Sequence, residues 1–329
     1  MKKTSSKRKG LKIAIATGLT VVVALAVVSW QLLGESFQEQ GSSPGASPYA
    51  TEQAAFGRPM NDTKREVDPA PPLLSLDELQ QGLAALDGST SIRGFGGYLL
   101  DANHEAMIRS ALAGFDDEDY TVGFVMMDIT TGYGVAYNVD EEFYSASSIK
   151  GVYCTSLIAE HPEAMTTYAD VLSGMISYSG NEEYLSIRME YWDDPIEHWS
   201  QAAGMEASLV TEWYPYYSAK TLAKLWLKNY EFFENRNEIT EEVSTWYEAT
   251  LNSAIHKNLG QSHQVFSKGG WIADEEEGFF SAIDAGIVYA GEGGSKPYVL
   301  VVMSDAPGSV AMLDPLVVVL NDIHDSMWP

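Results

Sequence analysis

The spacing of the hydrophobic positions changes along the chain, and each change marks a different kind of element. Residues 101–115 place apolar side chains three and four positions apart, which predicts an amphipathic helix. Residues 120–129 and 134–139 are apolar runs separated by TTGYG, which predicts a β-hairpin. Helical spacing then prevails from about 147 to 260. The first part of the chain therefore moves from helix and hairpin into a helical region.

Strand patterns return towards the C-terminus, at residues 264–272, 279–290 and 298–306, and an amphipathic helix is expected from about 309 to 326. Strands near both ends with helices between them indicate an α+β fold, in which helices flank an antiparallel sheet and form an inserted lobe. We expect this globular domain to occupy residues 91–329.

The N-terminus has a different character. Residues 1–12 carry six positive charges and no acid, and residues 13–33 contain no charged side chain. Twenty-one helical residues span about 30 Å, enough to cross a membrane, and the basic flank places residues 1–12 in the cytoplasm. We expect a single-pass cell-membrane anchor with the C-terminal domain outside the cytoplasm. A cleaved signal peptide is the alternative, although AVVSWQ is a poor cleavage site.

Residues 34–90 are expected to be a linker. This region is rich in glycine, serine and proline, as in GSSPGASPYA and DPAPP, and has little apolar surface to bury. The stretch LLSLDELQQGLAAL, at 73–86, has the spacing of a short amphipathic helix.

Charge and composition exclude several classes of function. The chain carries a net charge of −26, and residues 13–329 are more acidic still, so a nucleic-acid partner is not expected. The lone cysteine, Cys154, allows no internal disulfide, and the six histidines lack metal-ligand spacing. We expect neither a metal nor a cofactor.

Candidate chemistry appears where the helical region begins. In YSASSIKGVY, Ser147 and Lys150 lie three residues apart and would share one face of a helix. A lysine among apolar neighbours loses hydration, which lowers its pKa and lets the neutral amine accept a serine proton. Alternatively, the serine only caps the helix and the lysine extends to solvent.

Two later motifs add polar groups in a fixed order. MISYSGN places Ser179 and Asn181 at the end of an apolar helical stretch, and VFSKGGW places Lys268 on a strand before Gly269 and Gly270. Small residues on a strand allow a substrate backbone to approach its edge. Alone, each motif is an ordinary helix end or strand end.

Together, S-x-x-K, S-x-N and K-x-G resemble the signature of the penicillin-recognising serine hydrolases, and the layout is similar to the class A β-lactamase-related branch. The resemblance covers about residues 101–329. It implies a β-lactamase/transpeptidase-like fold and a Ser-Lys acyl-enzyme mechanism. The implied substrates or ligands are D-alanyl cell-wall peptides or β-lactams.

The resemblance also assigns roles to individual positions. Ser147 would be the nucleophile and Lys150 its base, while Ser179 would relay a proton to the leaving group. Asn181 would bind the substrate amide, and Lys268 would set the electrostatics of Ser179 and attract a substrate carboxylate.

The strand after Lys268 would complete the substrate site. Gly269, Gly270 and Trp271 would line it, and the backbone N–H groups of Ser147 and Trp271 would form the oxyanion hole.

The chain departs from the family pattern in three ways. The interval from Ser147 to Ser179 is short, which predicts a reduced helical lobe, and Gly269 replaces the usual threonine or serine. No E-x-x-L-N motif is present, only Glu206 and Glu212 in a short segment, so the usual deacylating glutamate has no counterpart. We therefore expect slow deacylation, and partial recovery of carboxylate binding on replacing Gly269 by threonine. The alternative is a degenerate module that binds cell-wall peptide or a protein partner without turnover.

Overall fold

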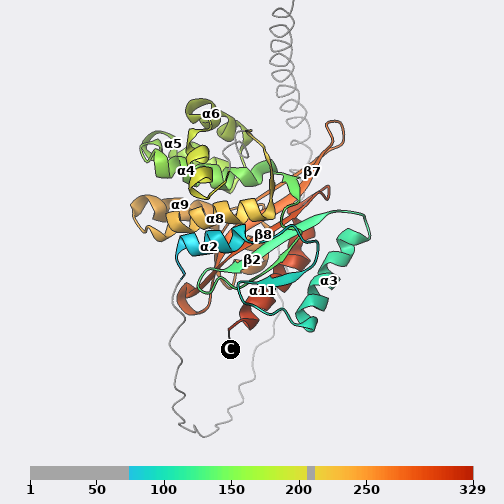
Figure 1. Cartoon of the computed structure of the whole chain (residues 1–329). Coiled ribbons are helices and arrows are strands. Elements are labelled where there is room, and N and C mark those ends of the chain that lie inside the picture. Colours follow the sequence, from blue (N-terminus) through green and yellow to red (C-terminus); the bar gives the residue numbers. More distant parts are fainter. Residues whose placement is uncertain (1–73, 206–211, 329) are drawn as a thin grey trace, which may run out of the picture. The chain divides into compact units, whose positions relative to one another are not determined.

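A six-stranded antiparallel sheet forms the centre of the domain in the computed structural model, which describes residues 74–205 and 212–328 (Figure 1). The strand order is β1-β3-β2-β8-β7-β6, so β6 is an edge strand. A separate two-stranded sheet pairs β4 with β5. The strands are β1 (Arg93–Phe95), β2 (Val122–Asp128), β3 (Gly134–Tyr137), β4 (Glu142–Tyr144), β5 (Tyr216–Ser218), β6 (Gln264–Asp274), β7 (Phe279–Ala290) and β8 (Lys296–Ser304).

Helices cover both faces of the large sheet. Helix α8 packs against β2, β7 and β8, while α11 packs against β2, β8 and α3. Helices α4, α5 and α6 gather in a lobe at the upper left of Figure 1. The helices are α2 (Leu76–Ala84), α3 (Ala102–Asp116), α4 (Ile149–Glu160), α5 (Ala164–Ser177), α6 (Asn181–Tyr191), α7 (Asp194–Ala202), α8 (Ala219–Glu234), α9 (Glu238–Glu248), α10 (Ala254–Leu259) and α11 (Asp314–Ser326).

The central strands are buried on both faces, which explains their unbroken apolar sequences. In β2, Val125 and Met127 pack in the core beneath α8, whereas Phe124 and Met126 pack in the core formed with α3 and α11. Successive residues of a strand point to opposite faces, so covering both faces requires apolar residues at every position. The expected α+β fold with an antiparallel sheet and flanking helices is confirmed.

The helical lobe meets the sheet at the first residues of α4. A single 3-10 turn, η2 (Ala146–Ser148), leads into α4 and contacts β6 and β7. Ten consecutive residues of α4, Ile149 to Ile158, are buried, because the helix is surrounded by α5, α7, α8 and β6. A lysine in this helix therefore lies in the protein interior.

The globular unit includes a helix from the segment expected to be a linker. Ser75 caps α2 by a capping box with Glu78, and Leu79 and Leu83 are buried in the core beneath α8. The domain thus begins before residue 91. No helix in the described part of the chain is long and apolar enough to span a membrane. The predicted anchor at residues 13–33 lies outside the described residues and stays a prediction.

Candidate functional site

Three segments that are distant in the sequence meet where the lobe joins the sheet. They are the η2–α4 segment, the turn between α5 and α6, and the edge strand β6. Hydrogen bonds connect Lys150 to Ser179 and Asn181, and Lys268 to Ser179. Ser147 lies in η2, directly before α4, with its backbone nitrogen close to Gly270 of β6.

Lys150 has the environment of a neutral base. Its side chain is fully buried, and Nζ donates hydrogen bonds to the carbonyl oxygen of Ser179 at 2.7 Å and to Oδ1 of Asn181 at 2.6 Å. Burial, and then the charge of Lys268, lower the pKa of Lys150 to about 6, although Glu183 opposes the shift. A neutral amine has two N–H groups, and both are used here. The lone pair therefore remains to accept a proton.

Lys268 is a second buried lysine, on β6. Its Nζ donates to Oγ of Ser179 and, at 2.8 Å, to the carbonyl oxygen of Gly269. Burial lowers the pKa of Lys268 to about 8, while Asp284, on the neighbouring strand β7, counteracts the shift. Lys268 is thus mostly protonated near pH 7, and its charge acts directly on the Ser179 hydroxyl.

The two adjacent serines of the turn differ in environment. Ser147 is partly exposed. Ser148 is fully buried, and its hydroxyl donates to the carbonyl oxygen of Ser145 at 2.6 Å and is hydrogen-bonded to the hydroxyl of Tyr217. Only Ser147 is therefore accessible to a substrate from solution.

Two non-glycine residues at this site have left-handed backbone conformations. Ala146, immediately before Ser147, has φ of 43°, and Ser179 has φ of 60°. Such conformations are costly for residues with a Cβ and persist where the surrounding structure holds them, commonly at functional sites.

Gly270 allows β6 to lie directly against the Ser147 turn. A Cβ at this position would overlap the backbone nitrogen of Ser148 and lie 2.6 Å from that of Ser147. The close approach brings the backbone at Trp271, the next residue of β6, beside the same turn. This arrangement fits the expected oxyanion hole of the Ser147 and Trp271 N–H groups.

Gly269 is also restricted by its surroundings, but by a different part of the chain. A Cβ here would overlap the carbonyl oxygen of Asn252, in the loop between α9 and α10, and would lie 3.4 Å from a methyl group of Val310. The expectation that Gly269→Thr restores carboxylate binding is therefore wrong. The space for a threonine side chain is already occupied by backbone.

Three residues near the site were not identified from the sequence. Tyr214 donates a hydrogen bond of 3.5 Å to Oδ1 of Asn181, the atom that also accepts from Lys150. Asn252 and Asp284 flank Gly269 and Lys268, as described above. The aromatic run EWYPYY was the only available signal for Tyr214, and nothing in the sequence pointed to the other two.

The segment before β5 contains the two glutamates noted in the sequence. Glu206 lies outside the described residues. Glu212 is exposed, and its charge acts on Tyr144 rather than on the lysines. Among residues 74–205 and 212–328, no cluster of side chains could hold a metal ion.

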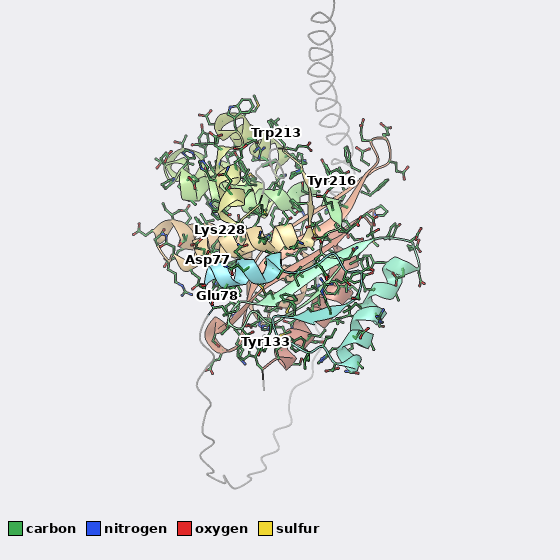
Figure 2. All side chains as sticks on the ribbon, in the orientation of Figure 1. Asp77, Glu78, Tyr133, Trp213, Tyr216 and Lys228 are labelled. Atoms are coloured by element: carbon green, nitrogen blue, oxygen red, sulfur yellow. The ribbon has the colours of Figure 1, made fainter. Side chains whose placement is uncertain are left out.

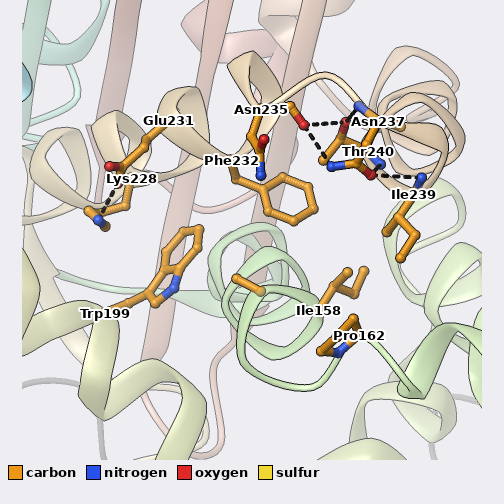
Figure 3. A pocket seen from close by; sticks show the side chains of 11 residues that line it. Ile158, Pro162, Trp199, Lys228, Glu231, Phe232, Asn235, Asn237, Ile239 and Thr240 are labelled. Atoms are coloured by element: carbon orange, nitrogen blue, oxygen red, sulfur yellow. Dashed lines mark hydrogen bonds and ion pairs between the residues drawn. The ribbon is translucent and has the colours of Figure 1, made fainter.

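A hollow of about 490 Å³ is lined mainly by residues of α4, α7, α8 and α9 (Figure 3). It is bordered by Trp199, Lys228, Phe232 and Thr240 and contains none of the candidate site residues. The site described here is therefore distinct from the hollow.

Comparison with known proteins identifies the fold. No protein-family model and no curated protein matches the chain. A β-lactamase structure from Chitinophaga pinensis DSM 2588 is 14% identical and matches 69% of this chain and 100% of its own, with a TM-score of 0.55. A β-lactamase from Desulfarculus baarsii DSM 2075 is 15% identical over 70% and 99% of the two chains, with a TM-score of 0.53.

The TLA-3 extended-spectrum β-lactamase gives a similar result, at 12% identity, 68% and 99% coverage and a TM-score of 0.53. The chain therefore has a β-lactamase-like fold, as its motifs predicted. Assignment to the class A branch stays a prediction.

Proposed function

We propose that this protein is a membrane-anchored, extracytoplasmic serine hydrolase that forms an acyl-enzyme on Ser147. The observation that carries the proposal is the state of Lys150: its pKa is lowered to about 6, and both N–H groups of the neutral amine are held by Ser179 and Asn181. A buried lysine with a free lone pair, one helical turn after an accessible serine, is equipped to act as a general base.

The first step would transfer the Ser147 hydroxyl proton to Nζ of Lys150 as Oγ bonds to the substrate carbonyl carbon. The backbone N–H groups of Ser147 and Trp271 would stabilise the oxyanion. As the tetrahedral intermediate collapses, the Ser179 hydroxyl would protonate the leaving group and regain a proton from Lys150, which returns to its neutral state. Lys268, hydrogen-bonded to Ser179, would stabilise the developing charge on that oxygen.

Release of the acyl group needs a base directed at a water molecule. Among the described residues, the candidates for this base are Lys150 and Glu183, a carboxylate whose charge acts on Lys150. We expect fast acylation and slow deacylation. D-alanyl peptides and β-lactams are the substrate classes that the β-lactamase-like fold favours.

The second candidate function is a binding module without turnover. The missing hydroxyl at Gly269, where the Asn252 carbonyl takes its place, favours this alternative. The two candidates differ in whether Ser147 becomes covalently modified.

Acyl transfer can be tested by intact and peptide mass analysis of the full-length protein after exposure to an activated aryl ester. We expect added acyl mass on Ser147, no addition in Ser147→Ala, and acylation of Lys150→Ala slower by about a hundredfold or more, as is typical on loss of a general base. Ser148→Ala is the matched control and should still be labelled at Ser147. Labelling that persists in Ser147→Ala would refute the assignment.

Membrane attachment has its own test. The mass of the protein extracted from membranes should include residues 13–33, whereas a mature N-terminus beyond residue 30 would indicate a cleaved signal peptide.

A further inference from the structure

A series of aromatic contacts leads away from the proposed base. Nζ of Lys150 lies 5.6 Å from the ring centroid of Tyr184. The Tyr184 ring packs edge-on against Tyr214, with centroids 5.4 Å apart, and the Tyr214 ring lies 6.2 Å from that of Tyr144. Tyr144 precedes Ser147 by three residues in the chain. The series of rings therefore begins directly beside the proposed catalytic groups.

Three aromatic residues surround the Tyr144 ring. Phe279, at the start of β7, stacks on it with ring centroids 4.6 Å apart, and Tyr216 packs edge-on against it at 5.5 Å (Figure 2). Tyr214 is the third neighbour. Tyr144 and Tyr216 are also paired across β4 and β5, so the small sheet fixes the positions of both residues. These four residues, Tyr144, Tyr214, Tyr216 and Phe279, form an aromatic cluster.

The aromatic cluster is not covered by the rest of the protein. Tyr216 is 46% exposed, and the other three members are partly exposed. Rings that only fill a core are shielded from water, as Tyr184 and Tyr217 are here. Exposed rings held by a small sheet, beside an accessible serine, instead offer an apolar surface to a ligand.

A hydrogen bond relates the aromatic cluster to one end of the substrate. The Tyr214 hydroxyl donates to Oδ1 of Asn181 at 3.5 Å, and Asn181 is the residue proposed to bind the substrate amide. The leaving group would lie instead at Ser179, whose hydroxyl is contacted by Lys268 from β6. The two ends of a substrate would thus be separated. The leaving group would face Ser179 and Lys268, and the acyl side chain would face Asn181 and the aromatic cluster.

From these contacts we infer that the aromatic cluster binds the acyl side chain of the substrate, so that Ser147 reacts preferentially with substrates whose acyl group carries an aromatic ring. The inference rests on the proposed acylation of Ser147 and narrows its substrate class. A flat ring can bury its face against the cluster and make the stacked and edge-on contacts that the cluster residues make with one another. An acetyl group has no such surface to bury.

Esters that share one leaving group isolate the acyl side chain. The para-nitrophenyl esters of phenylacetic, cyclohexylacetic and acetic acid all release para-nitrophenol when Oγ of Ser147 takes the acyl group. The second-order rate of mass addition to Ser147 is measured for each ester on the full-length protein. Each rate is divided by the rate of hydrolysis by hydroxide, which corrects for intrinsic reactivity. The cyclohexylacetyl ester is similar in size to the phenylacetyl ester but has no aromatic ring.

We expect the phenylacetyl ester to acylate Ser147 about ten- to a hundredfold faster than the acetyl ester after correction, the scale of burying one apolar ring. It should exceed the cyclohexylacetyl ester by about two- to tenfold, the scale of aromatic contacts beyond area burial. Equal rates for the phenylacetyl and acetyl esters would overturn the inference and leave acylation of Ser147 in place. So would a cyclohexylacetyl ester that reacts as fast as the phenylacetyl ester. Labelling by none of the three would remove the proposed function, and the inference with it.

Removing an exposed ring provides a second test. In Tyr216→Thr, which keeps a residue suited to a strand, the ratio of phenylacetyl to acetyl rates should fall by about three- to tenfold. Tyr216→Phe retains the ring and should retain the ratio. Tyr133 is 38% exposed and lies far from Tyr216 in Figure 2, so Tyr133→Thr is the control for loss of a surface tyrosine. An unchanged ratio in Tyr216→Thr, or an equal fall in Tyr133→Thr, would contradict binding at the aromatic cluster.

Discussion

Two consecutive glycines of β6, Gly269 and Gly270, contact different parts of the chain. At Gly270, the absent side chain lets the strand lie against the backbone of Ser147, where charge would develop during acyl transfer. At Gly269, the absent side chain makes room for the carbonyl oxygen of Asn252. The first contact fits the proposed catalysis, whereas the second packs the opposite face of β6 against the loop between α9 and α10.

This difference separates the proposed chemistry from the packing of the strand. The proposed acyl-enzyme would depend on Ser147, Lys150 and the Ser179–Lys268 hydrogen bond. The loop between α9 and α10 instead packs against β6 at Gly269.

Adding one methyl group at each glycine compares the two sides directly. Gly270→Ala should slow acylation of Ser147 by about ten- to a hundredfold, because the Cβ displaces the strand from the turn. Gly269→Ala should have the smaller effect on acylation and lower the free energy of unfolding by about 1–3 kcal/mol, the scale of overpacking. Aryl-ester labelling rates and thermal unfolding measure the two effects. A larger loss of acylation in Gly269→Ala would reverse our assignment of the two sides.

The pH dependence of acylation tests the paired lysines. The rate should rise through about pH 6 as Lys150 loses its proton, and fall above about pH 8 as Lys268 loses its charge. In Lys268→Gln, removal of the positive charge should raise the pKa of Lys150. The acidic limb of the pH–rate profile should then shift to higher pH by roughly one pH unit. The decrease in rate above about pH 8 should disappear. Acylation rates measured with the aryl ester from pH 5 to 9 would show both changes. If the acidic limb does not shift in Lys268→Gln, the charge of Lys268 does not affect the pKa of Lys150.

Tyr214 should give the smallest effect. Its hydroxyl shares Oδ1 of Asn181 with Lys150, so it helps to position these groups without contacting the nucleophile. We expect Tyr214→Phe to slow acylation about two- to tenfold, the scale of one neutral hydrogen bond. Tyr216→Phe, at an exposed ring two residues later, is the control. A loss above a hundredfold would mean that Tyr214 takes part in proton transfer.

Local patterns were sufficient to predict much of the fold and to place Ser147 and Lys150 next to one another. Helical spacing placed Ser147 and Lys150 on adjacent turns, and the apolar runs at 120–129 and 279–290 predicted strands that the structure contains. The order of three motifs predicted the β-lactamase-like fold. These inferences succeeded because each depends on residues that are close in the sequence or on a fixed order of motifs.

The remaining features depend on tertiary packing. Lys268 lies 89 residues from Ser179, and only the folded chain brings its Nζ to that hydroxyl. Asn252 contacts Gly269 through its backbone carbonyl. Every residue type has this group, so the sequence gives no signal for the contact. Gly269 could therefore be recognised as unusual in the sequence, but the reason that it must be glycine could not.

The contact between Gly269 and the Asn252 carbonyl also constrains how this protein can change over generations. A hydroxyl-bearing residue at 269 is harmful while the loop between α9 and α10 stays in place. The same residue becomes acceptable only after a substitution that moves this loop away. The effects of the two changes are therefore not additive, and their order is fixed. While the loop keeps this conformation, a side chain at position 269 carries a cost in stability that grows with its size.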